Sequence, residues 1–156
     1  MKQLSHIDQA GKSRMVDIAD KSSTRRTATA CATVLFPPSV YKQLKESKLE
    51  SAKGSIIDTA NIAGIMAAKK TAELIPMCHP LPVDYCQLSF TQNDDEHSLL
   101  ITAMVKVTHK TGVEMEALTA ASVAALTVYD MCKALSHDIH INHVHLVNKT
   151  GGKSNV

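Results

Sequence analysis

The sequence predicts an α+β domain in which two helices cover one face of a four-stranded antiparallel sheet. Three observations indicate this class. Four segments alternate apolar and polar residues as strands do, two longer segments have helical character, and their order along the chain is β-α-β-β-α-β. That order is the split β-α-β, or ferredoxin-like, arrangement. A chain of 156 residues has room for one core, so we expect a single domain over 1–156.

Residues 1–26 lack periodicity and are expected to form an irregular arm. The first strand is expected at 27–36, where alanines alternate with threonines. Pro37 and Pro38 end it, and 39–50 predict one extra short, exposed helix.

Ser55 and Asp58 have the spacing of a capping box and predict a helix from 56 to about 72. Its small residues share one face that would allow close packing: Ala60, Gly64, Ala67 and Ala68. Pro76, Pro80 and Pro82 cannot continue that helix, so 75–82 should be a stiff connection.

Two strands are expected at 83–91 and 97–109, separated by the polar loop 92–96. The longest helical signal covers 113–135, a length of about 34 Å. The last strand is expected at 139–147 and a flexible tail at 149–156. Strand 97–109 is partly apolar on both faces, whereas the helices cover only one, so we expect an oligomer.

Composition excludes several classes of function. The net charge of +2 and an aromatic content of 3% give no basis for nucleic-acid binding. No apolar run approaches the roughly 18 residues of a membrane span. The first twenty residues lack the apolar core of a secretion signal, so we expect a cytoplasmic protein whose four cysteines are free thiols.

The helix over 113–135 carries the first candidate for chemistry. Projected at 100° per residue, Asp130 and Lys133 share one side of the helix with Glu116. Two interpretations stay open at this point: an ordinary solvated ion pair, or a proton-handling pair on a rigid element.

Three further groups of residues are ambiguous. His79, within Met77-Cys78-His79 between prolines, suits proton transfer or a hydrogen-bonded turn. The histidines at 140, 143 and 145 make only a weak metal pattern and suit a surface or interface equally. Gly151-Gly152 beside Lys153 fits either an anion nest or a flexible tail.

Taken together, three blocks resemble the molybdenum cofactor biosynthesis protein C family: Ile62–Pro82, Lys110–Ala134 and Lys149–Ser154. The opening Leu4–Ile7 and Met15–Ile18 also resemble the family's start. Members of that family are cyclic pyranopterin monophosphate synthases. The resemblance implies a lyase that converts 3′,8-cyclo-7,8-dihydroguanosine 5′-triphosphate, supplied by a radical-SAM cyclase, into cyclic pyranopterin monophosphate and pyrophosphate. It also implies a hexamer, built as a trimer of dimers, with active sites between subunits.

The resemblance assigns roles to residues of this chain. Asp130, Lys133 and Lys53 match catalytic positions, with Asp130 as base or orienter and Lys133 as acid whose pKa is lowered in an interface pocket. Substrate-binding positions match Met77, Cys78, His79, Met115, Glu116, Glu114, Lys149 and Arg26. We expect no metal site and no required cofactor, although Mg²⁺ could accompany the triphosphate.

Three positions depart from the family pattern. Ser55 replaces the usual aspartate after Lys53-Gly54, His145 replaces a common arginine, and Asn155 replaces a glycine. Two alternative functions stay open: a nucleotide-binding regulatory oligomer, and a metal-binding protein that uses the histidines near the end of the chain.

Overall fold

The structure, a computed structural model, describes residues 4–156. The elements follow one another in this order: β1 (Thr24–Leu35), α1 (Pro38–Glu46), β2 (Glu50–Ser51), β3 (Gly54–Ser55), α2 (Ile56–Lys69), α3 (Thr71–Leu74), β4 (Tyr85–Asn93), β5 (Ser98–His109), α4 (Glu114–Cys132) and β6 (His140–Thr150).

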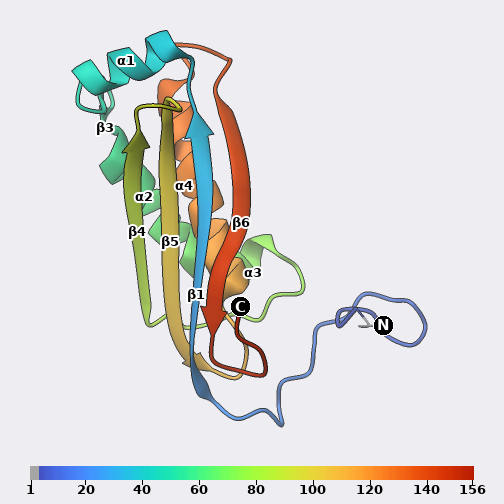
Figure 1. Cartoon of the computed structure of the whole chain (residues 1–156). Coiled ribbons are helices and arrows are strands. Elements are labelled where there is room, and N and C mark those ends of the chain that lie inside the picture. Colours follow the sequence, from blue (N-terminus) through green and yellow to red (C-terminus); the bar gives the residue numbers. More distant parts are fainter. Residues whose placement is uncertain (1–3) are drawn as a thin grey trace.

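The four long strands form one sheet in the order β4-β5-β1-β6, and every neighbouring pair is antiparallel. Helices α2 and α4 lie behind one face of this sheet, and α1 lies across one end of it (Figure 1). The α+β class and the ferredoxin-like arrangement predicted from the sequence are therefore confirmed.

The core between the sheet and the helices is built largely from small side chains. Ala28, Ala30 and Ala32 of β1 are fully buried, as are five alanines of α4: Ala117, Ala120, Ala121, Ala124 and Ala125. Gly64 of α2 lies so close to α4 that a Cβ atom there would approach the Ala120 carbonyl to 3.0 Å and the Ala124 Cβ to 3.3 Å. The predicted small-residue face thus allows α2 and α4 to pack closely.

Several predicted boundaries are wrong. β1 begins three residues earlier than expected, inside the segment assigned to the arm, and β6 extends to Thr150. The helix expected over 39–50 ends at Glu46, because Lys48 and Leu49 adopt positive φ angles of 54° and 58°. The helix expected to reach 135 ends at Cys132. In the segment expected as a tail, the Lys149 N–H donates to the Val156 carbonyl at 2.9 Å.

Other local predictions are confirmed. The Ser55 hydroxyl caps α2 by accepting a hydrogen bond from the Asp58 N–H at 3.2 Å, although the family's usual carboxylate is missing there. The outer face of β5 is partly apolar, with Leu100 exposed and Met104 half-buried. Within residues 4–156, no helix combines the length and the apolar character needed to cross a membrane.

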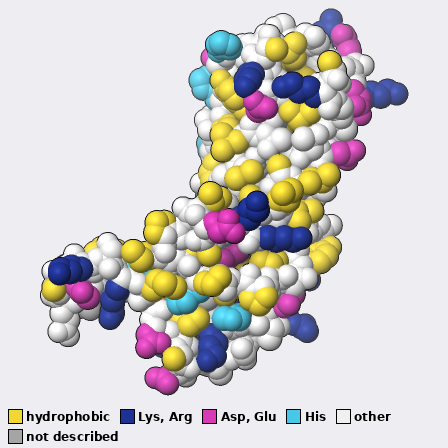
Figure 2. Space-filling model, turned by 180° about the vertical axis from the view of Figure 1, so that it is seen from behind, with side chains coloured by type: hydrophobic (Ala, Val, Ile, Leu, Met, Phe, Trp, Pro, Cys, Tyr) yellow, Lys and Arg dark blue, Asp and Glu magenta, His cyan; other side chains and the backbone are white. Residues whose placement is uncertain are grey.

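The arm that precedes β1 extends beyond the lower end of the sheet (Figures 1 and 2). It contains a small hairpin, with a bridge between Ile7 and Ser13 and a hydrogen bond from the Arg14 N–H to the His6 carbonyl. The Lys110 amine holds the arm to the body by donating to the Ala19 carbonyl at 2.8 Å.

Candidate active site

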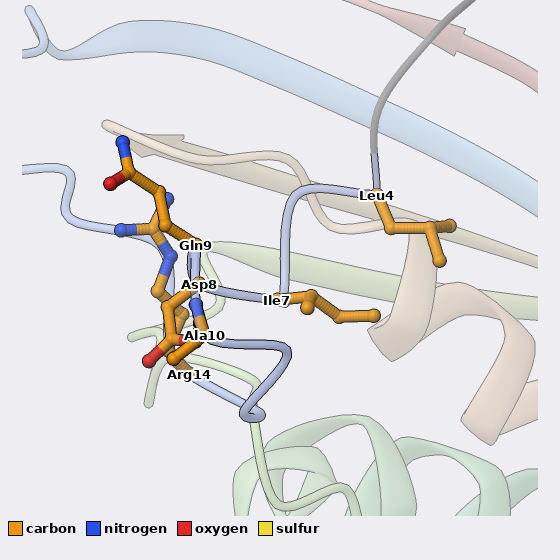
Figure 3. Close-up of a pocket in the computed structure, with 6 residues that line it drawn as sticks. All are labelled: Leu4, Ile7, Asp8, Gln9, Ala10 and Arg14. Carbon is orange, nitrogen blue, oxygen red and sulfur yellow. Dashed lines mark hydrogen bonds between the residues drawn. The ribbon is translucent and has the colours of Figure 1, made fainter.

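The hollow inside the arm's hairpin is a poor candidate site, although it measures about 790 Å³. All its lining residues come from one short segment, residues 4–14. Figure 3 shows Leu4 and Ile7 extending to one side, while Asp8 and Arg14 gather on the other. A binding site normally brings polar groups from several elements together inside a cavity, which this hollow does not.

A better candidate is a cleft of about 400 Å³ where three segments meet, which we call the His79 cleft. Its walls are the loop Met77–His79, the first turn of α4 at Glu114–Glu116, and the arm. The prolines on either side of the loop limit its freedom, as expected for the connection 75–82. Six residues that the resemblance marks for substrate binding therefore lie together: Met77, Cys78, His79, Glu114, Met115 and Glu116.

Glu116 is the most unusual side chain of this cleft. Only 4% of its surface is exposed, in the first turn of α4. Burial raises the pKa of its carboxyl to about 7, and the charge of Glu114 adds to the rise. A carboxyl group with such a pKa can give up or accept a proton near neutral pH.

Cys78 lines the same cleft, and burial together with the charge of Glu116 raises the pKa of its thiol. Because the thiolate is the reactive form of cysteine, Cys78 is suited to contact a ligand and not to attack it.

A second cavity, of about 830 Å³, lies between the start of β1, the end of β6 and the arm, and we call it the basic cavity. Lys149 donates to the Glu114 carboxylate at 2.7 Å. Burial alone would raise the pKa of Glu114, but the hydrogen bond from Lys149 and the charges of Lys149 and Arg26 lower it overall. Glu114 therefore stays ionised and fixes the Lys149 amine in place.

Arg26 is fixed as well. Its Nε donates to the His109 carbonyl at 3.0 Å and its Nη2 to the Lys110 carbonyl at 3.2 Å. Because backbone groups at the end of β5 hold one edge of the guanidinium, its orientation in the basic cavity is set.

The two cavities are neighbours, because four residues line both: Lys21, Thr111, Gly112 and Glu114. The His79 cleft is thus partly apolar and holds a carboxyl that can be protonated, whereas the neighbouring basic cavity holds several cations. Sequence reasoning missed Lys21 and Thr111, since Lys21 stands in no recognisable motif and Thr111, although inside the block Lys110–Ala134, received no role. The arm brings Lys21 to the site, whereas Thr111 lies there because it comes just before α4.

The remaining three predicted residues lie at the other end of α4. Lys133 donates to the Asp130 carboxylate at 2.5 Å, and both side chains are more than half exposed. Lys53, in the turn between β2 and β3, is close enough for its charge to help lower the pKa of Asp130, after the larger effects of Lys133. Lys53 also lines an apolar hollow of about 470 Å³ beside Met131 and Leu135. We call Lys53, Asp130 and Lys133 the Asp130 cluster.

The lowered pKa expected for Lys133 concerns an interface pocket, and in the single subunit its pKa shifts in the other direction. The hydrogen bond to Asp130, and then the negative charge of that carboxylate, raise the pKa of Lys133. Desolvation of the amine opposes this rise but is a smaller effect than either contribution of Asp130.

Within one subunit the Asp130 cluster is far from the His79 cleft. Glu116 and Asp130 are fourteen residues apart on α4, a rise of about 21 Å along the helix. Hydrogen-bond reach is about 3 Å, so the two groups of one chain cannot act on the same reacting atoms.

The histidines near the end of the chain do not come together. His140 pairs with Asp138 at 2.7 Å, whereas His145 lies 3.5 Å from the Cys31 sulfur. Within the described part of the chain, no group of three or more His, Cys, Asp or Glu side chains is placed to hold a metal ion. The metal-binding alternative therefore has no support from geometry.

Comparison with known proteins gives a consistent result. A family model described as the MoaC family matches residues 15–152. The chain is 55% identical over 153 residues to a cyclic pyranopterin monophosphate synthase of Xanthomonas campestris pv. campestris (strain B100), covering 98% of this chain and 92% of the relative. The protein of the same name from Brevibacillus brevis is 50% identical over 152 residues, with coverage of 97% and 93%. That from Staphylococcus epidermidis is 48% identical over 157 residues, with coverage of 99% and 96%.

Proposed function

The chain belongs to the MoaC family, and from that premise we infer that it is a cyclic pyranopterin monophosphate synthase of molybdenum cofactor biosynthesis. It is a lyase that rearranges 3′,8-cyclo-7,8-dihydroguanosine 5′-triphosphate into cyclic pyranopterin monophosphate and releases pyrophosphate. The observation in the structure that carries this function is that the His79 cleft and the basic cavity are neighbours with shared walls, since the substrate joins a heterocyclic base to a triphosphate.

The base of the substrate fits the His79 cleft. A guanine-derived ring presents N–H donors on one edge, and Glu116 offers a buried carboxyl with a pKa of about 7. Met77 and Met115 supply apolar contacts, and His79 adds an imidazole to the lining of the cleft. We assign recognition of the ring and one proton transfer to this cleft.

The triphosphate fits the basic cavity. Arg26 is held there by two carbonyls at the end of β5, and Lys149 is held by Glu114. Both cations are therefore oriented before the anion binds. Cations placed in advance around the leaving pyrophosphate stabilise the charge that develops when its bond to the remaining phosphate breaks.

The rearrangement opens one ring and closes another, so it needs several proton transfers at fixed geometry. We assign Asp130 as base or as the group that orients Lys133, Lys133 as acid, and Lys53 as a cation that meets phosphate. Burial of this exposed pair against substrate would desolvate the Lys133 amine and lower its pKa, whereas in the single subunit the contribution of Asp130 prevails and raises it.

We propose that two subunits build each active site. The Asp130 cluster of one chain would face the His79 cleft of another, which removes the separation of about 21 Å within one α4. The surface formed by α2 and α4 is available for such contacts, since Ile62, Met66 and Leu126 are 50–58% exposed on it. Figure 2 shows hydrophobic side chains spread over this face. A hexamer arranged as a trimer of dimers is the assembly that we propose.

We further propose that no resident cofactor takes part, because the assigned residues supply both proton transfer and charge neutralisation. The substrate would come from a radical-SAM cyclase, and the free cysteines suit the cytoplasm.

The function is tested by incubating the purified chain with the cyclase product and measuring pyrophosphate and pterin. We expect pyrophosphate and pterin to form in equal amounts. Unchanged rates after treatment with a chelator would exclude a Mg²⁺ requirement. Nucleotide binding without either product would contradict the enzyme and favour a regulatory oligomer.

A further inference from the structure

The segment that follows β6 forms a closed loop. The Lys149 N–H donates to the Val156 carbonyl at 2.9 Å, and the Val156 N–H donates back to the Lys149 carbonyl at 3.1 Å. This pair of backbone hydrogen bonds closes residues 151–155, which we call the C-terminal loop. The loop therefore has a fixed base on the strand that carries Lys149.

Two glycines place the loop directly against β1. Gly151 and Gly152 have φ angles of +80° and +94°, which side-chain-bearing residues rarely adopt. A Cβ atom on Gly151 would collide with the Arg25 carbonyl oxygen, and one on Gly152 would collide with the Arg26 guanidinium. The loop thus lies close to Arg26 only because both positions lack side chains.

The loop forms one wall of the basic cavity, through Gly151, Gly152, Lys153 and Ser154. Among residues 4–156, the Lys153 amine makes no hydrogen bond or ion pair, in contrast to Lys149, which Glu114 occupies. Nor do the backbone N–H groups of residues 152–154 donate to any other described group. The wall facing Arg26 therefore offers a cation and several unused donors.

The charges lining the cavity nearly balance before a ligand enters. Four cations stand there, namely Lys21, Arg26, Lys149 and Lys153, against the carboxylates of Asp17, Asp20 and Glu114. Since Lys149 is paired with Glu114, an anion arriving in the cavity depends on the cations that are still free. Lys153 is one of these.

We propose that the C-terminal loop is a phosphate-binding element, in which the Lys153 amine and the backbone N–H groups of residues 152–154 hold the pyrophosphate portion of a nucleoside triphosphate opposite Arg26. Backbone N–H groups in glycine-containing turns form such anion sites in proteins. The proposal rests on the proposed function and extends it to the C-terminal loop, for which the sequence left an anion nest and a flexible tail as alternatives.

The test is titration of the full-length chain with inorganic pyrophosphate by calorimetry, together with kcat and KM for the cyclised nucleotide. Lys153→Met keeps the apolar stem and removes the charge. We expect it to weaken pyrophosphate binding about tenfold, the loss of one charge-assisted hydrogen bond, and to raise KM more than it lowers kcat. Lys153→Arg should retain most of the affinity.

Lys42→Met is the matched control, because Lys42 is an exposed lysine of α1, at the opposite end of the molecule. It should leave pyrophosphate binding unchanged. Equal affinities for the unsubstituted chain and Lys153→Met, or no pyrophosphate binding at all, would overturn the role of the loop. In that case, normal turnover by the unsubstituted chain and by Lys153→Met would leave the proposed function intact. Conversely, pyrophosphate binding that depends on Lys153 without any turnover would contradict the proposed function alone.

Discussion

Glu116 and Asp130 lie on the same side of α4, about 21 Å apart along its axis, and each belongs to a separate group of candidate catalytic side chains. Glu116 is buried in the cleft at the N-terminal end of the helix, whereas Asp130 is exposed beside Lys133 at the other end. This separation is the main reason to assign the active site to two subunits.

The first prediction concerns the Asp130–Lys133 pair. Asp130→Asn and Lys133→Ala should each abolish turnover, because the first removes a base and the second removes an acid. Both side chains are more than half exposed, so neither change should alter stability by more than about 0.5 kcal/mol. Turnover assays and size-exclusion chromatography measure the two effects. Near-normal rates in either variant would show that our assignment of roles is wrong.

The second prediction concerns the pH dependence of stability. The pKa of Glu116 rises from an ordinary value of 4.5 to about 7 on folding. Between these pH values the unfolded chain has released this proton and the folded chain still holds it, so stability falls as pH rises through that window. The loss is of the order of 3 kcal/mol.

The side chain at position 116 cannot titrate in Glu116→Gln, so this variant should lack the decrease in stability that Glu116 causes as pH rises. Urea unfolding of both proteins at pH 4.5 and pH 8 and at one protein concentration gives the comparison. We expect the variant to gain stability relative to the parent at the higher pH. A difference between the two proteins that does not change with pH would contradict a protonated Glu116 in the cleft. Glu116→Gln should also lose most activity, since an amide cannot transfer the proton.

The third prediction concerns the contact between α2 and α4. In Gly64→Ala the new Cβ would press on the Ala120 carbonyl and the Leu88 side chain, so the helices must separate. Overpacking typically costs 1–3 kcal/mol, against a gain of up to about 1 kcal/mol in helix propensity. We expect a net loss of about 1–2 kcal/mol in urea unfolding. Lys69→Ala, an exposed substitution near the end of the same helix, should change little.

Much of the fold followed from local patterns in the sequence. Alternation in β1 and β5 and the small-residue face of α2 are properties of single segments, so each could be recognised without tertiary information. The end of α1 could not, because Lys48 and Leu49 take a conformation that usually signals glycine. Closure of the C-terminal loop also escaped prediction, since it depends on hydrogen bonds between two backbone segments.

The candidate site was less accessible to prediction. Helical projection placed Glu116, Asp130 and Lys133 on one side of a helix, but it does not report distance along the axis. The resemblance to a family identified the residues of the His79 cleft, and the structure brings them together. Lys21 belongs to no motif, and its place in the site depends on how the arm returns to the body.

The central claim is that each active site combines the His79 cleft of one subunit with the Asp130 cluster of another. Mixing two inactive variants tests it most directly. Glu116→Gln and Asp130→Asn chains, co-expressed in equal amounts and purified together, should regain about a quarter of the parent activity. In random assembly about half of the sites take their cleft from a chain with Glu116 intact, and about half of those take their cluster from a chain with Asp130 intact. Each variant purified alone should stay inactive. If the mixed assembly forms and shows no more activity than the separate variants, the two-subunit site is contradicted.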